Sequence, residues 1–182
     1  RGNHEVMVRG AFGNIRIKNE MAPGTEGGFT KLYPEGKTMS IYEAAMEYKK
    51  RGNDLVVIAG KEYGAGSSRD WAAKGTKLLG VKAVIVESFE RIHRSNLIGM
   101  GILPLQFKDG FSKKKLNLKG SELFTILGVE KNIIPGQEVV CEIKYADGVI
   151  KKIHLLSRID TANEVEYYKN DGILKYVLRG ML

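Results

Sequence analysis

Short apolar runs alternate with helix-like stretches through the middle of the chain. The runs at residues 55–60, 81–89 and 101–107 are rich in β-branched and aliphatic side chains, which is typical of buried strands. Between them, residues 68–79 and 90–100 have the pattern of helices. This alternation predicts parallel strands joined by right-handed crossovers.

Helix caps outline the segments on either side. Ser40 and Glu43 form a capping box, which predicts that a helix begins directly after Ser40. Thr161 and Glu164 form a second capping box at the start of a helical tail. After Gly172 the tail continues as a further helix.

An antiparallel hairpin is predicted in the second half of the chain. Alternating runs at residues 138–145 and 149–156 flank Asp147 and Gly148, and Asp-Gly between such runs favours a tight turn. Residues 19–36 are rich in Gly and Pro and predict a long surface loop. The predicted fold is one compact α/β domain over residues 1–182, with a parallel strand–helix–strand core and an accessory antiparallel hairpin.

The composition is that of an ordinary globular domain. With 182 residues, of which 43% are hydrophobic and 27% charged, the chain can bury a sizeable core. No apolar run is long enough to cross a bilayer, and the amino end lacks the apolar segment of a signal peptide, so we predict no membrane association. The chain does not begin with Met, which leads us to expect a piece of a longer protein.

Cys141 is the single cysteine of the chain. It lies in an alternating apolar run, so we predict a buried strand thiol. One cysteine cannot form an internal disulfide, and by itself it cannot hold zinc or an iron–sulfur cluster. The low cysteine content favours a reducing compartment, and a cytoplasmic location is predicted.

The net charge of +8, from 29 basic and 21 acidic residues, is compatible with an anionic partner. Nucleic acid, a polyanionic metabolite and an acidic neighbouring domain all fit this description. A solvated lysine-rich surface explains the same charge. The densest basic run, residues 113–115, has no interleaved aromatic side chains and is a poor nucleic-acid signature.

One loop places serines and an arginine directly before a helix: residues 63–75 read YGAGSSRDWAAKG. Ligands of open α/β sheets bind at the carboxyl ends of strands, where this loop is expected. Its glycines allow a ligand to come close, the first helical amides favour an anion, and Arg69 can make two hydrogen bonds to a carboxylate. Ser67 or Ser68 could instead cap the helix. The loop alone leaves both interpretations open.

Two common enzyme classes do not fit this loop. No histidine is placed locally to activate Ser67 as a nucleophile, and Arg69 stands where the nucleophile elbow requires Gly. No Gly-Lys-Ser/Thr follows, so the loop is not a P-loop. An alkoxide at Ser67 could, however, be stabilised by neighbouring amides and by Arg69.

Two long motifs resemble the carboxy-terminal domain of the aconitase family. They are RGNHEVMVRGAFGNIRIKN at the start of the chain and VVIAGKEYGAGSSRDWAAKGTKLLGVKAVIVESFERIHRSNLIGMGILPLQF in its middle. The resemblance covers nearly the whole chain and is strongest to the branch of single-chain bacterial and iron-regulatory aconitases. It implies a swivelling β/β/α domain that closes over three earlier domains, in an enzyme that interconverts citrate and isocitrate through cis-aconitate.

The resemblance also implies roles for four residues. Ser67 matches the catalytic serine that takes the carbon-bound proton as its alkoxide. Ser68 and Arg69 match neighbours that bind a substrate carboxylate and support the alkoxide. Arg9, in VRGAFGNI, matches an arginine that clamps another carboxylate of the tricarboxylate.

The family's four-iron four-sulfur cluster is held by three cysteines of the other domains, so this chain is expected to contribute no metal ligand. The open iron of that cluster is the Lewis acid that activates the departing hydroxyl. We therefore expect tricarboxylates and the cluster-bearing domains of the same enzyme as partners. We also expect no aconitase activity from this chain alone.

Alternatives remain within and beyond the family. The same branch includes a dehydratase of the 2-methylcitrate pathway with a very similar loop. Iron-regulatory members bind RNA stem-loops, which the positive charge would favour. A domain retained only for docking would not need the intact set of four site residues. The isopropylmalate isomerases, which have a separate small subunit, continue the motif as SSREH, where this chain has Asp70 and Trp71.

The other histidines and arginines are not predicted to be catalytic. His93 is expected to pack on a helix face, and His154 to lie at the surface of a hairpin strand. Arg91, Arg94 and Arg158 are expected to be surface or interdomain residues.

Overall fold

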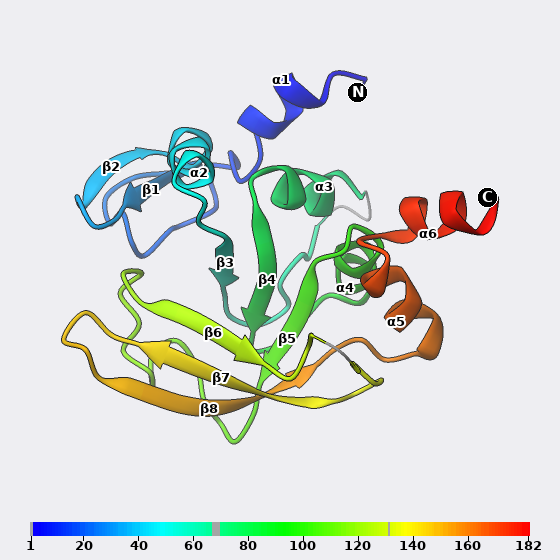
Figure 1. Ribbon diagram of the computed structural model, residues 1–182. Coiled ribbons are helices and arrows are strands. Elements are labelled where there is room, and N and C mark those ends of the chain that lie inside the picture. The colour runs from blue at the N-terminus through cyan, green and yellow to red at the C-terminus, as the bar shows by residue number, and fades with distance from the viewer. Residues whose placement is uncertain (1, 67–69, 131) are drawn as a thin grey trace.

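A computed structural model describes residues 2–66, 70–130 and 132–182. Its centre is a six-stranded sheet with the strand order β3-β4-β5-β8-β7-β6 (Figure 1). The strands are β3 (Leu55–Ile58), β4 (Val81–Val86), β5 (Leu103–Phe107), β6 (Leu123–Leu127), β7 (Glu138–Lys144) and β8 (Ile150–Ser157).

The sheet has a parallel half and an antiparallel half. Strands β3, β4 and β5 are parallel, whereas β5 pairs with β8, β8 with β7 and β7 with β6 in antiparallel fashion. The predicted α/β class, the parallel core and the hairpin at residues 146–148 are therefore confirmed. The hairpin does not stand apart, because β8 joins it to the parallel strands through β5 (Figure 1).

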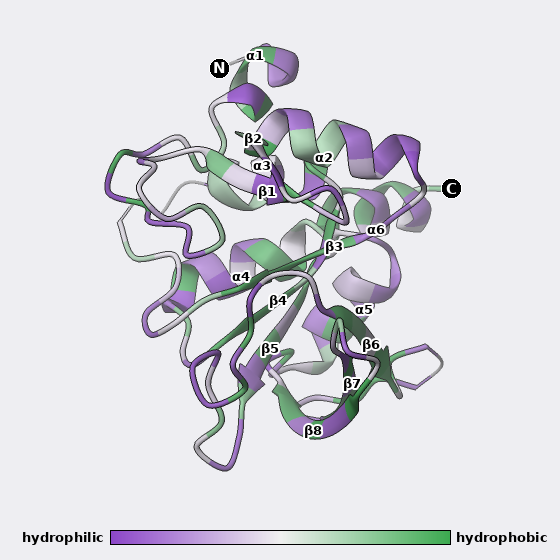
Figure 2. Ribbon diagram, turned by 90° about the vertical axis from the view of Figure 1, so that its left-hand side faces the viewer, coloured by the Kyte–Doolittle hydropathy of each residue, from purple (hydrophilic) through white to green (hydrophobic). Residues whose placement is uncertain are grey.

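The two predicted crossover helices are present as α3 (Trp71–Leu78) and α4 (Arg91–Gly99). Apart from the exposed Lys82, strand β4 is apolar, because both of its faces are buried (Figure 2). On one face Val84 and Val86 pack in a cluster with Ala73 of α3 and Leu97 of α4. The helices therefore cover this face of the parallel strands.

A second core lies on the opposite face of β4. Ala83 and Ile85 point into it, together with buried side chains of β7 and β8 such as Cys141 and Leu155. Along β7, buried positions alternate with more exposed ones, as the alternating sequence predicts. The thiol of Cys141 is buried, which confirms the prediction.

The tail forms two helices, α5 (Ala162–Lys169) and α6 (Ile173–Gly180), as predicted. Most apolar side chains of α6 stay exposed, with Leu174 at 74% and Leu178 at 57% of full accessibility. Tyr176 is also exposed, at 40%, but its ring packs edge-on against Tyr167 of α5 with 5.2 Å between centroids. No described helix has the length and apolar character to cross a membrane.

The first part of the chain differs from the prediction. Residues 19–36 do not form one loop, because β1 (Phe29–Leu32) lies among them and pairs with β2 (Lys37–Ser40) in a separate two-stranded sheet. Helix α1 (His4–Arg9) was not predicted either, and α2 (Ile41–Lys50) begins at the predicted position. Strands of four residues and a helix of six are too short to show a clear periodicity.

The strand β3 also departs from the prediction, because its residues are only half-buried. It lies at the edge of the sheet, where fewer neighbours cover it. The capping box of Ser40 and Glu43 is confirmed by both of its hydrogen bonds. At Thr161 only half of the box forms, because the Glu164 carboxylate accepts instead from the amide of Asp160.

Replacement of Gly101 by Ala should strongly destabilise the fold. Gly101 has φ +74°, and a Cβ at this position would lie 2.7 Å from the carbonyl carbon of Asp171. Left-handed strain costs about 1–2 kcal/mol for a residue with a side chain, and the overlap adds about 1–3 kcal/mol. We therefore expect the free energy of unfolding to fall by about 3 kcal/mol in urea titrations.

Gly80→Ala is the matched control for that substitution. Gly80 has φ +90°, but nothing lies within 4 Å of the position that its Cβ would occupy. Its replacement should therefore cost only the backbone strain of about 1–2 kcal/mol. If both variants lost the same free energy of unfolding, the backbone at Asp171 would move away from the new Cβ at no energetic cost.

Candidate active-site loop

The predicted serine loop connects the carboxyl end of β3 to the start of α3. Ser67, Ser68 and Arg69 themselves lie outside the described residues, so their roles stay predictions. The structure describes the loop up to Gly66 and again from Asp70. Helix α3 begins at Trp71, three residues later than the sequence pattern predicted, and the Asp70 side chain makes no capping hydrogen bond.

The first half of the loop is hydrogen-bonded to the segment that follows β4. The amide of Tyr63 donates to the carbonyl of Ser88 at 3.0 Å, and the amide of Glu90 donates to the carbonyl of Tyr63 at 2.9 Å. The amide of Glu62 donates to the Ser88 hydroxyl at 2.8 Å. Two loops from the same edge of the sheet are thereby tied together, which defines the path of the chain at Glu62 and Tyr63.

Aromatic side chains pack beneath this path. The ring of Tyr63 meets the ring of Phe89 at 6.3 Å and the imidazole of His93 at 5.2 Å, both edge-on. Burial raises the pKa of the Tyr63 phenol, which therefore stays neutral. His93 is only 4% exposed, which confirms that it is a packing residue of its helix.

Arg9 is the one predicted site residue that the structure describes, and it lies exposed at the end of α1. Its guanidinium stacks on the ring of Tyr42 from α2, 4.7 Å from the centroid, and donates to the carbonyl of Glu5. Stacking and the hydrogen bond both restrict the guanidinium. The contact with Tyr42 was not predicted, since no local sequence signal links α1 to α2.

The segment that carries Arg9 packs against the helix that follows the serine loop. Helices α1 and α3 are in contact, and the methyl group of Ala11 lies 3.1 Å from the place that a Cβ on Gly75 would occupy. A side chain at position 75 would push these segments apart. The structure thus places the segment with Arg9 against the helix that follows the serine loop.

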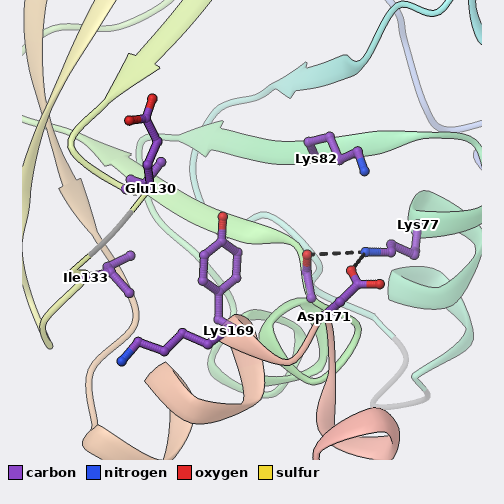
Figure 3. Close-up of a pocket in the computed structure, with 9 residues that line it drawn as sticks. Lys77, Lys82, Glu130, Ile133, Lys169 and Asp171 are labelled. Atoms are coloured by element: carbon purple, nitrogen blue, oxygen red, sulfur yellow. Dashed lines mark hydrogen bonds and ion pairs between the residues drawn. The ribbon is translucent and has the colours of Figure 1, made fainter.

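A cavity of about 320 Å³ lies elsewhere, near the start of β4 and the turn before β5 (Figure 3). Its lining includes Lys77, Lys82, Gly101 and Asp171, and the Asp171 carboxylate pairs with Lys77 and with Lys175. These positions belong to the amino ends of the parallel strands, whereas the serine loop leaves the carboxyl end of β3. Arg9, the predicted site residue that the structure describes, does not line this cavity.

Comparison with known proteins identifies the family of this chain. A sequence profile of the aconitase C-terminal domain matches residues 1–110. The chain belongs to the aconitase C-terminal domain family. The resemblance that the two sequence motifs carry is thereby confirmed.

Several bacterial proteins named Aconitate hydratase A are similar to this aconitase C-terminal domain. Those of Legionella pneumophila and Pseudomonas aeruginosa are 68% and 60% identical over 98% and 100% of the chain. That of Escherichia coli K12 is 60% identical over 100% of the chain. In each case the chain spans about a fifth (20%) of the relative's length.

Among solved structures, the crystal structure of a 3-isopropylmalate dehydratase from Methanocaldococcus jannaschii is similar, with a TM-score of 0.47. The two sequences are 24% identical, and the match covers 82% of this chain and 83% of that one.

The residues of this aconitase C-terminal domain do not fit an iron–sulfur cluster. Cys141 is the only cysteine, and burial raises the pKa of its thiol to about 12, so it offers no thiolate. Among the described residues, no group of three His, Cys, Asp or Glu side chains is placed to hold a metal ion. A cluster of the kind that the family implies would need ligands from another part of the protein.

Three arginines and one histidine discussed in the sequence differ in burial. Arg91 and His154 are exposed, as predicted. Arg158 is half-buried and donates to Gln106 and Asp160. The surface prediction for Arg94 is wrong, since it is only 9% exposed and its guanidinium binds the Glu164 carboxylate. A charged side chain on one helix can be buried when a helix later in the chain supplies a residue of opposite charge, here Glu164 of α5. The sequence around Arg94 does not indicate that pairing.

The buried His93 should make stability depend on pH above the range in which carboxylates titrate. Desolvation lowers the pKa of His93 below its ordinary value of 6.5, and the charge of Glu90 opposes this only in part. The unfolded chain therefore binds more protons than the folded chain as pH falls below the ordinary pKa. The contribution of neutral His93 to the free energy of unfolding is fully present above pH 6.5, the ordinary pKa. It is lost as pH falls through the pKa of His93 in the folded state.

Thermal unfolding between about pH 7 and pH 5 measures this effect. We expect the midpoint of the wild-type protein to fall across this range more steeply than that of His93→Asn, which has no proton to take up there. Tyr63 stays neutral throughout the range, and Glu90 titrates below its ordinary value of 4.5 because the amides of Ile92 and His93 hold its charged form. Parallel slopes for the two proteins would contradict the prediction.

Proposed function

We propose that this chain is the substrate-binding and proton-transfer domain of an aconitate hydratase, which interconverts citrate and isocitrate through cis-aconitate. The observation that carries the proposal is the identity of 55–68% to proteins named Aconitate hydratase A across essentially the whole chain. The loop with Ser67, Ser68 and Arg69 leaves the carboxyl end of a parallel strand, where ligands of α/β sheets bind.

In the proposed reaction, Ser67 is the base. Its alkoxide accepts the proton from the substrate carbon next to a carboxylate. The electron pair of the broken C–H bond forms the double bond of cis-aconitate as the C–O bond at the neighbouring carbon breaks, and the hydroxyl group leaves as water after taking up a proton. A serine alkoxide is strongly basic, and it needs a positive charge and amide donors nearby to exist at neutral pH. Arg69 supplies the charge, and the first turn of α3 supplies amides without intrahelical partners.

Arginine is suited to the substrate, which carries several carboxylates. The planar guanidinium makes two parallel hydrogen bonds to a carboxylate and keeps its charge at every physiological pH. In the proposal Arg69 and Ser68 bind one carboxylate, and Arg9 binds another. The stack of Arg9 on Tyr42 holds the guanidinium in place before the substrate arrives.

The chain alone is proposed to be inactive. Its residues do not fit the iron–sulfur cluster that the family implies, and it spans about a fifth (20%) of the relatives' length. The cluster is therefore assigned to the rest of a longer polypeptide, of which residues 1–182 form one domain that swings against the others.

An assay of cis-aconitate formation tests the proposal. The full-length protein that carries this domain, anaerobic and with its cluster reconstituted, should convert citrate. The same protein without this domain should keep its cluster spectrum but lose turnover, and the isolated chain should show none. Turnover at an enzyme-like rate by either piece alone would overturn the proposal. Assaying 2-methylcitrate beside citrate decides between the two substrates.

A further inference from the structure

We propose that the apolar side of helix α6 is a docking surface for the rest of the longer polypeptide to which this domain is assigned. The inference rests on the proposed function only because it treats the chain as one domain of a longer enzyme. It concerns a surface that the proposed reaction does not use. Helix α6 contacts α4 and α5 and lies at the outer edge of the molecule (Figure 1).

Helix α6 turns its polar side toward the turn that precedes it. The guanidinium of Arg179 donates to the side-chain oxygen of Asn170 at 2.8 Å and to the carbonyl of the same residue at 3.2 Å. The ammonium group of Lys175 pairs with the carboxylate of Asp171. Lys175 and Arg179 are four residues apart, so they lie on one side of the helix. Their contacts hold that side against the domain itself.

The apolar side of α6 therefore stays uncovered. Leu174, Val177, Leu178 and Met181 follow each other at helical spacing and form one apolar stripe. Their exposure runs from 48% at Val177 to 78% at Met181. Within the described residues, none of the three hydrophobic clusters includes a side chain of α6. A surface helix normally turns such a stripe toward a core, and here it points away from one.

The shortness of α6 indicates that the apolar stripe has a partner. The helix has eight residues, and Gly172 at its N-cap provides no side-chain hydrogen bond. Helices shorter than about 12–15 residues are marginal in water by themselves, and packing of an apolar face supplies most of their stability in proteins. Tyr176 packs on Tyr167, but the apolar stripe contributes no such packing in this domain.

The size of the apolar stripe favours a partner in the same polypeptide over a second copy of the protein. A helix of eight residues is about 12 Å long and about 10 Å wide, so one side offers roughly a few hundred Å². A stable dimer buries about 800 Å² on each partner. A contact within one polypeptide needs less area, because the linkage raises the effective concentration to about the millimolar range.

The relatives have enough additional chain to supply this partner. The match to the Pseudomonas aeruginosa protein covers 100% of this chain, so it includes α6, but only 20% of that relative's length. The matching surface should consist of aliphatic side chains, because a charged group buried against leucine would lose its hydration. Acidic side chains around it would complement the net charge of +8 on this domain.

Hydroxyl-radical labelling of the intact full-length protein, analysed by mass spectrometry, tests the inference. Leu174 and Leu123 of β6 are a matched pair, since their side chains are identical and they are 74% and 65% exposed in this domain. If the apolar stripe is docked in about 90% of the molecules, Leu174 should be labelled about tenfold more slowly than Leu123. Labelling of Leu174 as fast as Leu123, or faster, would overturn the inference.

A substitution in the apolar stripe tests whether α6 itself makes the contact. Leu174→Asp introduces a charge into the stripe, and the domain should stay folded because Leu174 is exposed in it. In the full-length protein this variant should raise the labelling rate of Leu178 by about tenfold, to a rate near that of Leu123. Leu123→Asp is the control and should leave Leu178 protected. Protection of Leu178 that survives Leu174→Asp would contradict the proposed docking surface.

Dilution of the full-length protein identifies the partner. Protection of Leu174 by the same polypeptide does not depend on protein concentration. Protection that falls on dilution would assign the apolar stripe to a second copy. Protection that requires vesicles of phosphatidylcholine and phosphatidylglycerol would assign it to a membrane surface. Either result would overturn the inference.

Turnover of citrate separates this inference from the proposed function. If the full-length protein converts citrate and Leu174 is labelled as fast as Leu123, only the docking surface is wrong. If Leu174 is protected and no citrate is converted, the proposed activity is wrong and the docking surface stands.

Discussion

Ser67→Ala in the full-length protein should lower kcat for citrate by about 10³–10⁴-fold, while KM changes little. The substitution removes the oxygen that accepts the proton and leaves Ser68, Arg69 and Arg9 to bind the substrate. A residue that acts only in the transition state affects kcat far more than the binding of the ground state. Steady-state kinetics on cluster-reconstituted protein, with citrate and 2-methylcitrate in parallel, measure both quantities.

Ser112→Ala is the control for this substitution. Ser112 is only half-buried, and its hydroxyl accepts from the amide of Lys115 in a connection after β5. Its loss should leave kcat unchanged. If Ser67→Ala retains near-normal turnover, Ser67 is a helix cap, and the proton must pass to another group.

Arg94→Met should lower the free energy of unfolding by about 3–5 kcal/mol. The Arg94 guanidinium binds both oxygens of the Glu164 carboxylate, at 3.1 and 2.9 Å, and donates to the carbonyl of Arg158 at 2.6 Å. Methionine fills much of the same volume but leaves the carboxylate without its cation. The side chain of Glu164 is only 14% exposed, so water compensates poorly.

Arg51→Met provides the comparison, because the chemistry is the same and the burial differs. Arg51 also binds a carboxylate through two nitrogens, at 3.2 and 2.8 Å to Glu35, but the Glu35 side chain is 48% exposed. Exposed ion pairs contribute about 0–1 kcal/mol, and Arg51→Met should cost no more. Urea titrations of both variants measure the difference.

A second substitution at the buried pair identifies the cause of the loss. Arg94→Met/Glu164→Leu removes the charge that Arg94→Met leaves behind, and it should recover a large part of the lost stability. Losses of similar size for Arg94→Met and Arg51→Met would show that burial of the pair has no effect. A double variant less stable than Arg94→Met would assign the loss to the other hydrogen bonds of Glu164.

Local signals predicted the larger elements of the fold correctly. The crossover helices α3 and α4, the Asp147–Gly148 turn and the helix start after Ser40 all depend on neighbours within a few residues. Hydrophobic periodicity and capping chemistry carry that information directly. The short strands β1 and β2 were missed, because four residues do not establish a period and their pairing with each other stabilises them.

The composition of the candidate site was also visible in the chain. Ser67, Ser68 and Arg69 are adjacent, and their order before a helix is enough to indicate a polar, positively charged loop. The sequence did not show which side chains from other segments lie around that loop. The stack of Arg9 on Tyr42 and the close approach of Gly64 to His93 join residues that are far apart in the sequence.

The amino-acid sequence alone predicted the order of the larger elements, the family and the candidate site residues. All three depend on residue type and short spacing. Only the tertiary structure decided which charges are buried and which side chains contact the described part of the loop. Arg94 and His93 look alike in the sequence as polar residues of one helix, yet one closes a buried ion pair and the other a ring contact. Burial depends on which distant segments fold over a residue, and no local pattern contains that information.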